Sequence, residues 1–261
     1  MDLGLKDKIV IVTGGGSGIG QAISRLLLQE SARVVVVSRA SDNVSTFIAE
    51  MQKTHAPCEF VEADLSDIAQ CERAVRNVEQ RHSSLYGLVN NAGTNDGVGL
   101  EHGTPEGFVQ SLQQNLVHYY AMTHYALPML KASRGAIVSI SSKVALTGQG
   151  GTSGYAAAKG AQLALTREWA AELAPLGIRA NAVLPAEVMT PLYENWISQR
   201  PDPQKALDEI RRRIPLGHRM TEASEIAAMA VFLLSPTQSA HTTGQHVIVD
   251  GGYTHLDRAL T

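Results

Sequence analysis

Short runs of β-branched and aliphatic residues alternate with longer amphipathic stretches along almost the whole 261-residue chain. The run at 8–13 reads KIVIVT and the run at 33–38 reads RVVVVS. Continuous apolar runs of this length are typical of strands buried on both faces of a sheet. The apolar residues between these two runs recur at helical spacing: Ile19, Ile23, Leu26 and Leu27. This alternation predicts an α/β fold in which helices cover both faces of a parallel sheet.

The same pattern places the remaining elements. We expect strands at 8–13, 33–38, 59–62, 86–90, 136–141, 178–183 and 246–249. We expect helices at 17–30, 42–53, 67–81, 105–131, 153–173 and 222–234. An irregular insert that covers the substrate is expected at about 190–213. Because no repeat or linker interrupts the chain, we predict one Rossmann-like, doubly wound domain over 1–261, with ligand bound beyond the carboxyl ends of seven parallel strands.

Charge and cysteine content exclude several classes of protein. The net charge of −3 provides no basic surface for nucleic acid or an anionic membrane. Two cysteines, Cys58 and Cys71, are too few for a disulfide scaffold or a four-cysteine zinc site, and no metal is expected. The first residues carry charges where a signal peptide needs an apolar core, and no uncharged apolar run is long enough to cross a bilayer. A cytoplasmic protein is the expectation.

A glycine-rich loop, TGGGSGIG at 13–20, lies between the first strand and the first helix. Its glycines do not follow the common dinucleotide spacing of i, i+2 and i+5, but glycines 14, 18 and 20 suit a wider turn. Without Cβ atoms the backbone can approach a pyrophosphate lying on the helix N-terminus. The loop residues expected to contact a dinucleotide are Gly14, Gly16, Ser17, Gly18 and Ile19.

The end of the second strand indicates which dinucleotide binds. An NAD site usually has an acidic residue there, whereas this chain has Ser38 followed by Arg39. A serine and a guanidinium can bind a ribose 2′-phosphate, so we predict NADP, with NAD also possible. Arg39 could instead be a solvated charge at the end of the strand. Asp64 could hydrogen-bond the adenine amine or cap the next helix, and Leu65 beside it is assigned to the cofactor site.

Three polar residues form a candidate catalytic group. Tyr155 and Lys159 are four residues apart and therefore share one face of the predicted helix. A nearby ammonium and a positively charged nicotinamide would favour the phenolate and lower the pKa of Tyr155, so that it could act as a base. Ser142 lies at the end of the preceding strand, where its hydroxyl could hold the substrate oxygen.

Over essentially its whole length the chain resembles the short-chain dehydrogenase/reductase family. The matching motifs, in the order of the family, are TGxxxGIG at 13–20, NNAG at 90–93, Asn115, Ser142, YxxxK at 155–159 and PxxxxT at 185–190. The resemblance implies that Tyr155 is the general acid/base, that Ser142 anchors the substrate, and that Lys159 binds the nicotinamide ribose and tunes Tyr155. It implies that Asn115 holds a water in a proton relay from Lys159. It adds six residues to the cofactor site: Asn91, Gly93, Tyr155, Lys159, Val188 and Thr190.

The residues of the loops over the crevice are small and polar, which suits a polyhydroxylated small molecule, and we expect a monosaccharide as substrate. The expected substrate contacts are Asn95, Ser142, Lys143, Gln149, Tyr155, Glu187 and Trp196. These loops most resemble those of aldose dehydrogenases within the family, L-fucose dehydrogenases in particular. The resemblance implies oxidation of the anomeric C1 hydroxyl of a fucose-like pyranose to a lactone.

Two alternatives stay open. A 3-oxoacyl or hydroxysteroid oxidoreductase could use the same scaffold, although neither a basic docking patch nor a strongly apolar pocket is evident. A non-catalytic, cofactor-sensing binding protein is the alternative from another class, and the intact catalytic set argues against it. The family also implies a homotetramer or homodimer that pairs through the helices at 105–131 and 153–173 and through the segment at 245–252.

Overall fold

Seven parallel strands form one sheet in the computed structural model, which describes residues 1–256. The strands are β1 (Ile9–Thr13), β2 (Arg33–Ser38), β3 (Cys58–Glu62), β4 (Gly87–Asn90), β5 (Ala136–Ile140), β6 (Arg179–Pro185) and β7 (His246–Val249). Their order across the sheet is β3-β2-β1-β4-β5-β6-β7, and every neighbouring pair is parallel. The predicted doubly wound α/β fold is confirmed.

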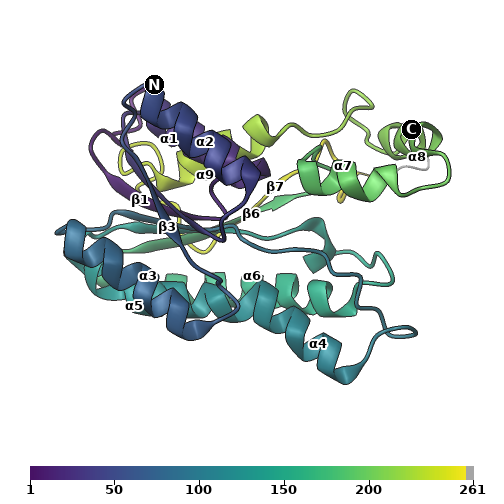
Figure 1. Cartoon of the computed structure of the whole chain (residues 1–261), viewed down its shortest axis with the longest axis horizontal. Helices are drawn as coiled ribbons and strands as arrows, with labels where there is room; N and C mark the ends of the chain where they lie inside the picture. The colour runs from purple at the N-terminus through teal and green to yellow at the C-terminus, as the bar shows by residue number, and fades with distance from the viewer. Residues whose placement is uncertain (257–261) are drawn as a thin grey trace.

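Helices lie on both faces of this sheet (Figure 1). Those on one face are α1 (Gly18–Gln29), α2 (Asp42–Lys53) and α9 (Ala223–Leu234). Those on the other face are α3 (Ile68–Arg81), α4 (Pro105–Leu112), α5 (His118–Ser133) and α6 (Ser153–Leu173). Two further helices, α7 (Pro191–Ser198) and α8 (Pro203–Arg212), lie beyond one end of the sheet. No helix within residues 1–256 is both long and apolar enough to cross a membrane.

The side chains of β1 alternate between two hydrophobic cores. In β1, Val10 and Val12 pack into the core that contains Ile23 and Leu27 of α1. Ile11, between them, packs into the core on the opposite face. All of these side chains are fully buried. A strand with both faces covered must be apolar at every position, which explains the continuous β-branched runs of the sequence.

The direction of the chain through the sheet reverses between β1 and β4. After β1 the chain moves to β2 on one side, and it later returns to β4 on the other. The loops that follow the two strands therefore diverge and leave a crevice at the carboxyl ends, where ligands bind in folds of this type. The glycine loop and the segment after β4 border this crevice.

The helix predicted at 105–131 is interrupted. The structure has α4, then a π-helical segment at Gln113–Val117, then α5. In a π turn the backbone bonds reach one residue further than in an α-helix, so the carbonyls around the segment are redirected. Periodicity of apolar residues does not detect one extra residue in a turn, which is why the sequence predicted a continuous helix.

The prediction of irregular structure at about 190–213 was wrong, because α7 and α8 lie there. The side chain of Thr190 accepts a hydrogen bond from the backbone of Tyr193 at the start of α7, and Pro191 occupies the first turn. Asp202 caps α8 in the same way, ahead of Pro203. A capping side chain followed by proline is a strong signal for a helix start, and it was present in the sequence.

Candidate active site

A cavity of about 860 Å³ lies at the carboxyl ends of the strands. Of the residues predicted for the cofactor, Gly14, Ser17, Gly18, Ile19, Ser38, Arg39, Asp64, Leu65, Asn91, Gly93, Val188 and Thr190 line it. Ser142, Tyr155 and Lys159 line the same cavity. The topology thus brings residues that follow six of the strands into the lining of one cavity, which has room for an extended ligand.

The glycine loop is packed too tightly for side chains. A Cβ atom at Gly20 would lie 2.2 Å from the carbonyl oxygen of Gly14, and Gly14 itself has a φ of +63°. Gly16 lies outside the cavity lining and packs on α2, where a Cβ would come within 2.7 Å of Val44. The loop therefore presents bare backbone to the cavity at Gly14 and Gly18, while Gly16 permits the close approach of α2.

The N-terminus of α1 opens into this cavity without a side-chain cap. Ser17, at the N-cap position, makes no side-chain hydrogen bond to the first turn, whereas α2, α3, α4, α7 and α8 are each capped by a side chain. The first amides of a helix carry partial positive charge and need acceptors. An uncapped helix start behind a glycine loop therefore fits the pyrophosphate of a dinucleotide.

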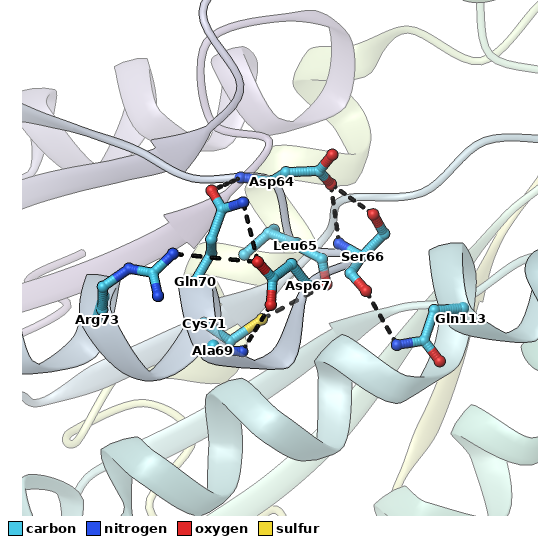
Figure 2. Close-up of polar contacts among 9 residues, drawn as sticks. All are labelled: Asp64, Leu65, Ser66, Asp67, Ala69, Gln70, Cys71, Arg73 and Gln113. Atoms are coloured by element: carbon cyan, nitrogen blue, oxygen red, sulfur yellow. Dashed lines mark hydrogen bonds and ion pairs between the residues drawn. The ribbon is translucent and has the colours of Figure 1, made fainter.

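Asp64 forms part of the cavity wall after β3 (Figure 2). Its Oδ1 accepts hydrogen bonds from the hydroxyl of Ser66 at 2.7 Å and from the backbone of Ser66 at 3.0 Å. These bonds hold the pKa of Asp64 below its usual value, so the carboxylate is ionised and can accept from a ligand. The N-cap of α3 is Asp67, not Asp64, so the helix-cap alternative for Asp64 does not apply.

Ser38 and Arg39 lie at the end of β2, near Asp64 in the cavity. Both line the cavity, and the Ser38 hydroxyl donates to the backbone oxygen of Arg39 at 3.1 Å. Arg39 is exposed and close enough to Asp64 for an electrostatic attraction that contributes to the lowered pKa of the carboxylate. The arrangement offers one guanidinium and one hydroxyl to a ligand in this part of the cavity.

The candidate catalytic side chains meet at the other end of the cavity. Tyr155 and Lys159 share one face of α6, with the Lys159 Nζ 5.4 Å from the centre of the Tyr155 ring. Burial raises the pKa of Tyr155 to about 12, and a hydrogen bond with Ser142 offsets part of this rise. Burial lowers the pKa of Lys159 to about 7. The expected depression of the Tyr155 pKa is therefore not seen in the protein alone, because burial disfavours both charged forms.

Asn115 lies behind this pair, in the π-helical segment, and is fully buried. Its Oδ1 accepts from the backbone of Thr94 at 2.8 Å, and its Nδ2 donates to the backbone oxygen of Ser111 at 3.0 Å. Its own backbone oxygen accepts from Nε2 of Gln162 at 2.6 Å. The side chain of Asn115 thus fixes the loop after β4, and its carbonyl faces α6.

Three residues of this site were missed from the sequence: Tyr119, Gln162 and His118. The Tyr119 hydroxyl donates to the backbone oxygen of Ile140 at 2.9 Å and accepts from Lys159 at 3.5 Å. His118 lines the cavity, and burial lowers its pKa to about 4. Tyr119 follows Asn115 by four residues and Gln162 follows Lys159 by three, so helical spacing could have identified both.

The predicted substrate residues beyond Ser142 and Tyr155 lie outside the cavity lining. Lys143 and Glu187 form a buried ion pair, and Glu187 also accepts from the Tyr193 hydroxyl at 2.7 Å. Trp196 packs edge-on against Tyr193 and is about 40% exposed. Asn95 and Gln149 are exposed residues of the surrounding loops. Lys143, Glu187 and Tyr193 therefore satisfy one another. The assignment of the five predicted residues to the substrate stays a prediction.

Comparison with known proteins adds independent information. A family model described as enoyl-(acyl carrier protein) reductase matches residues 14–254. The L-fucose dehydrogenase of Bos taurus is 36% identical over 246 residues, which are 94% of this chain and 88% of that protein. The 3-oxoacyl-acyl-carrier-protein reductase FabG of Thermotoga maritima is 33% identical over 95% of this chain and 98% of its own.

A solved structure agrees with the fold in detail. The crystal structure of the Cj0485 dehydrogenase has a TM-score of 0.94 and 46% sequence identity, and the match covers 100% of this chain and 99% of the other. The similarity extends over every strand that contributes to the cavity. It includes both ends of the site, the glycine loop and the Tyr155 helix.

Proposed function

Because this chain belongs to the short-chain dehydrogenase/reductase family and is an oxidoreductase, we propose that it oxidises the anomeric C1 hydroxyl of an L-fucose-like aldose to a lactone, with NADP as cofactor. The observation that carries the proposal is the convergence of Ser142, Tyr155 and Lys159 on one cavity that continues to the glycine loop. This convergence supports a proton acceptor and a dinucleotide site that share one continuous space.

The residues of the chain have distinct roles in this reaction. Ser142 donates a hydrogen bond that holds the oxygen of the substrate hydroxyl beside Tyr155. Tyr155 takes the proton of that hydroxyl as general base, and the ammonium of Lys159 stabilises the resulting negative charge. A bound nicotinamide supplies the acceptor for the two electrons and the hydrogen that leave C1. The hemiacetal carbon thereby becomes the carbonyl carbon of the lactone.

Two observations favour a sugar as the substrate. L-Fucose dehydrogenase is the name of a relative that matches nearly the whole chain. The rim of the cavity also carries Lys143, Glu187 and Tyr193, whose hydrogen bonds could be shared with sugar hydroxyls. A second candidate, reduction of a 3-oxoacyl thioester, is favoured by the similarity to FabG over 98% of that protein.

A substrate panel separates these activities. Purified protein is mixed with NADP⁺ or NAD⁺ and with L-fucose, other aldoses or a hydroxysteroid, and formation of the reduced cofactor is followed by absorbance. Acetoacetyl thioester with reduced cofactor tests the 3-oxoacyl reaction. The proposal predicts turnover with L-fucose or a sugar of the same configuration. Turnover with the thioester or the steroid and none with any sugar would reject it.

The cofactor preference is tested at the end of β2. We propose that Arg39 pairs with the 2′-phosphate of NADP and that Ser38 donates to it. A hydrogen bond to a charged group contributes about 1.5–3 kcal/mol, so NADP⁺ should bind roughly 10- to 150-fold more tightly than NAD⁺. Ser38→Asp combined with Arg39→Ala should reverse the order in a fluorescence titration. Equal binding of both cofactors to the natural protein would show that Arg39 is a surface charge.

We also propose the setting in which the enzyme works. Cys58 and Cys71 are both free, which is consistent with a reducing compartment such as the cytoplasm. We propose assembly into a homotetramer or homodimer through α4, α5 and α6, with a second contact at 245–252.

A further inference from the structure

The side-chain amide of Gln162 lies between Lys159 and the backbone of the π-helical segment. Its Nε2 donates to the carbonyl oxygen of Asn115 at 2.6 Å, and its Oε1 accepts from the Lys159 Nζ at 3.4 Å. Gln162 is 1% exposed. If this buried amide lost either partner, an unpaired polar group would destabilise the folded state. Because one end donates and the other accepts, the two contacts also fix the orientation of the amide.

The π turn explains why the Asn115 carbonyl is available. In an uninterrupted α-helix this oxygen would accept from the amide four residues later, that of Tyr119. The segment Gln113–Val117 has π geometry instead, and the oxygen is directed to α6. Gln162 lies one turn beyond Lys159 on the same face of α6 and is long enough to reach it. The Gln162 amide thus connects Lys159 on α6 with the Asn115 carbonyl of the π-helical segment.

Lys159 is surrounded by acceptors and by few charges. Besides Gln162, its Nζ donates to the carbonyl oxygen of Ile140 at 2.8 Å and to the Tyr119 hydroxyl at 3.5 Å. The titratable groups that face it are Tyr155 on α6 and Tyr119 and His118 on α5. Among the described residues that contact Lys159, no carboxylate is close enough to form an ion pair. Neutral acceptors alone therefore hold its ammonium in a buried place.

We propose that Gln162 is a positioning residue of the reaction: its amide joins Lys159 to the Asn115 carbonyl, and so keeps the lysine ammonium charged and oriented beside Tyr155. The inference deepens the proposed function and rests on it for the role of Lys159. Gln162 lies outside the cavity lining, so it acts through Lys159 and through Tyr119, with which its side chain also forms a hydrogen bond. Its loss should therefore change the ionisation of Lys159.

Two substitutions should move this ionisation in opposite directions. Gln162→Met keeps a similar shape but removes an acceptor, so Lys159 should lose its proton at a pH lower by about one unit. Gln162→Glu places a carboxylate at the same distance, so Lys159 should keep its proton to higher pH. The titration is measured by NMR on cofactor-free protein with isotope-labelled lysine, with Lys159→Arg to assign the signal. This measurement needs no substrate, so it is independent of whether sugars are oxidised.

The kinetic profile provides the second measurement. With a substrate that the natural enzyme turns over, the alkaline limb of kcat/KM should move to lower pH in the Met variant and to higher pH in the Glu variant. The Met variant should lose about 10-fold in kcat, the order expected for one hydrogen bond to a charged group. Thr166→Val is the matched control, because the Thr166 hydroxyl bonds only the backbone oxygen of Gln162, at 2.8 Å, one turn further on.

The outcomes distinguish the possible roles of Gln162. An unmoved Lys159 titration in both variants, or a shift in the same direction in both, would overturn the proposal and leave Gln162 as a packing residue. If the Met variant does not fold, the upward shift in the Glu variant alone decides the question. The natural protein could oxidise none of the panel substrates while the Met and Glu variants still shift the Lys159 titration in opposite directions. In that case the proposed function fails and the positioning of Lys159 by Gln162 stands.

Discussion

Burial determines the chemistry of individual residues in this site. Tyr155 and Lys159 are both removed from water, and their pKa values move apart, to about 12 and about 7. Near neutral pH the phenol is therefore protonated, and the ammonium is only partly retained. Positive charge added beside the phenol would reverse its shift, whereas the surrounding apolar residues cannot. The protonation of Tyr155 and Lys159 should accordingly depend on the charge of what binds in the cavity.

Replacing Tyr155 by phenylalanine removes the proton acceptor alone. General acid–base groups contribute about 10²–10⁴-fold to rate, so Tyr155→Phe should lose at least that factor in kcat while cofactor affinity changes little. Both are measured on the same preparation, by steady-state kinetics and by fluorescence titration. Tyr86→Phe is the matched control, since it removes another buried hydroxyl, bonded to the Leu234 oxygen at 2.8 Å, away from the cavity. A Tyr155→Phe enzyme with more than roughly a tenth of natural activity would contradict the mechanism.

The buried ammonium of Lys159 should also appear in the pH dependence of stability. The pKa of this lysine falls from 10.5 to about 7 on folding. Between these values the unfolded chain binds more protons, so this group makes the folded state more stable as pH rises from 7 toward 10. Lys159→Met removes the dependence, and its advantage in melting temperature should be greatest at pH 7 and shrink with rising pH. A difference in melting temperature between Lys159→Met and the natural protein that stays constant across this pH range would refute the assignment.

At the scale of elements, the sequence predicted what depends on local pattern. The β-branched runs located all seven strands, and the Tyr155–Lys159 spacing located the face of α6 that lines the cavity. The π turn before α5 was not predictable, because it depends on contacts with α6 that are distant in sequence. The rim residues Lys143 and Glu187 were recognised as polar and close to the site, but only the tertiary structure shows that they pair with each other.

This ion pair connects α7 to the segment after β5. Glu187 accepts from both Lys143 and Tyr193, and Tyr193 belongs to α7. Breaking one side of a buried pair leaves an uncompensated charge and costs about 3–5 kcal/mol. We expect Glu187→Gln to lower the melting temperature by several degrees and to raise KM for the substrate more than for the cofactor.

A second substitution tests the same connection with a smaller change. Tyr193→Phe removes one neutral donor from the carboxylate and should cost about 0.5–1.5 kcal/mol or somewhat more, since the acceptor is charged. Burial raises the pKa of Tyr193 to about 12, so its hydroxyl stays a donor throughout the neutral range. In thermal unfolding, the melting temperature of Glu187→Gln should therefore be lower than that of Tyr193→Phe. An unchanged melting temperature for Glu187→Gln would mean that the Lys143–Glu187 ion pair does not stabilise the position of α7.

At the scale of the whole molecule, one sheet with helices on both faces leaves the outer surfaces of α4, α5 and α6 without a further layer (Figure 1). On α5, Tyr120 is 56% exposed and stacks on the exposed ring of His124, with 5.8 Å between ring centres. Aromatic side chains are enriched at the centres of protein interfaces. With a net charge of only −3, long-range repulsion between copies of the chain is weak.

We therefore expect the protein in solution to have two or four times the 28.0 kDa mass of one chain, as measured by light scattering or sedimentation. Tyr120→Asp places a charge where the helices of two copies would pair, so it should lower the mass toward that of a single chain while the far-ultraviolet circular dichroism is unchanged. Leu100→Asp is the control, because Leu100 is 93% exposed but lies in the loop before α4, outside the proposed interface. A natural protein of 28.0 kDa would refute the assembly. An oligomer that dissociates with Leu100→Asp but not with Tyr120→Asp would instead place the interface at that loop, because a charge disrupts only the surface that it is buried in.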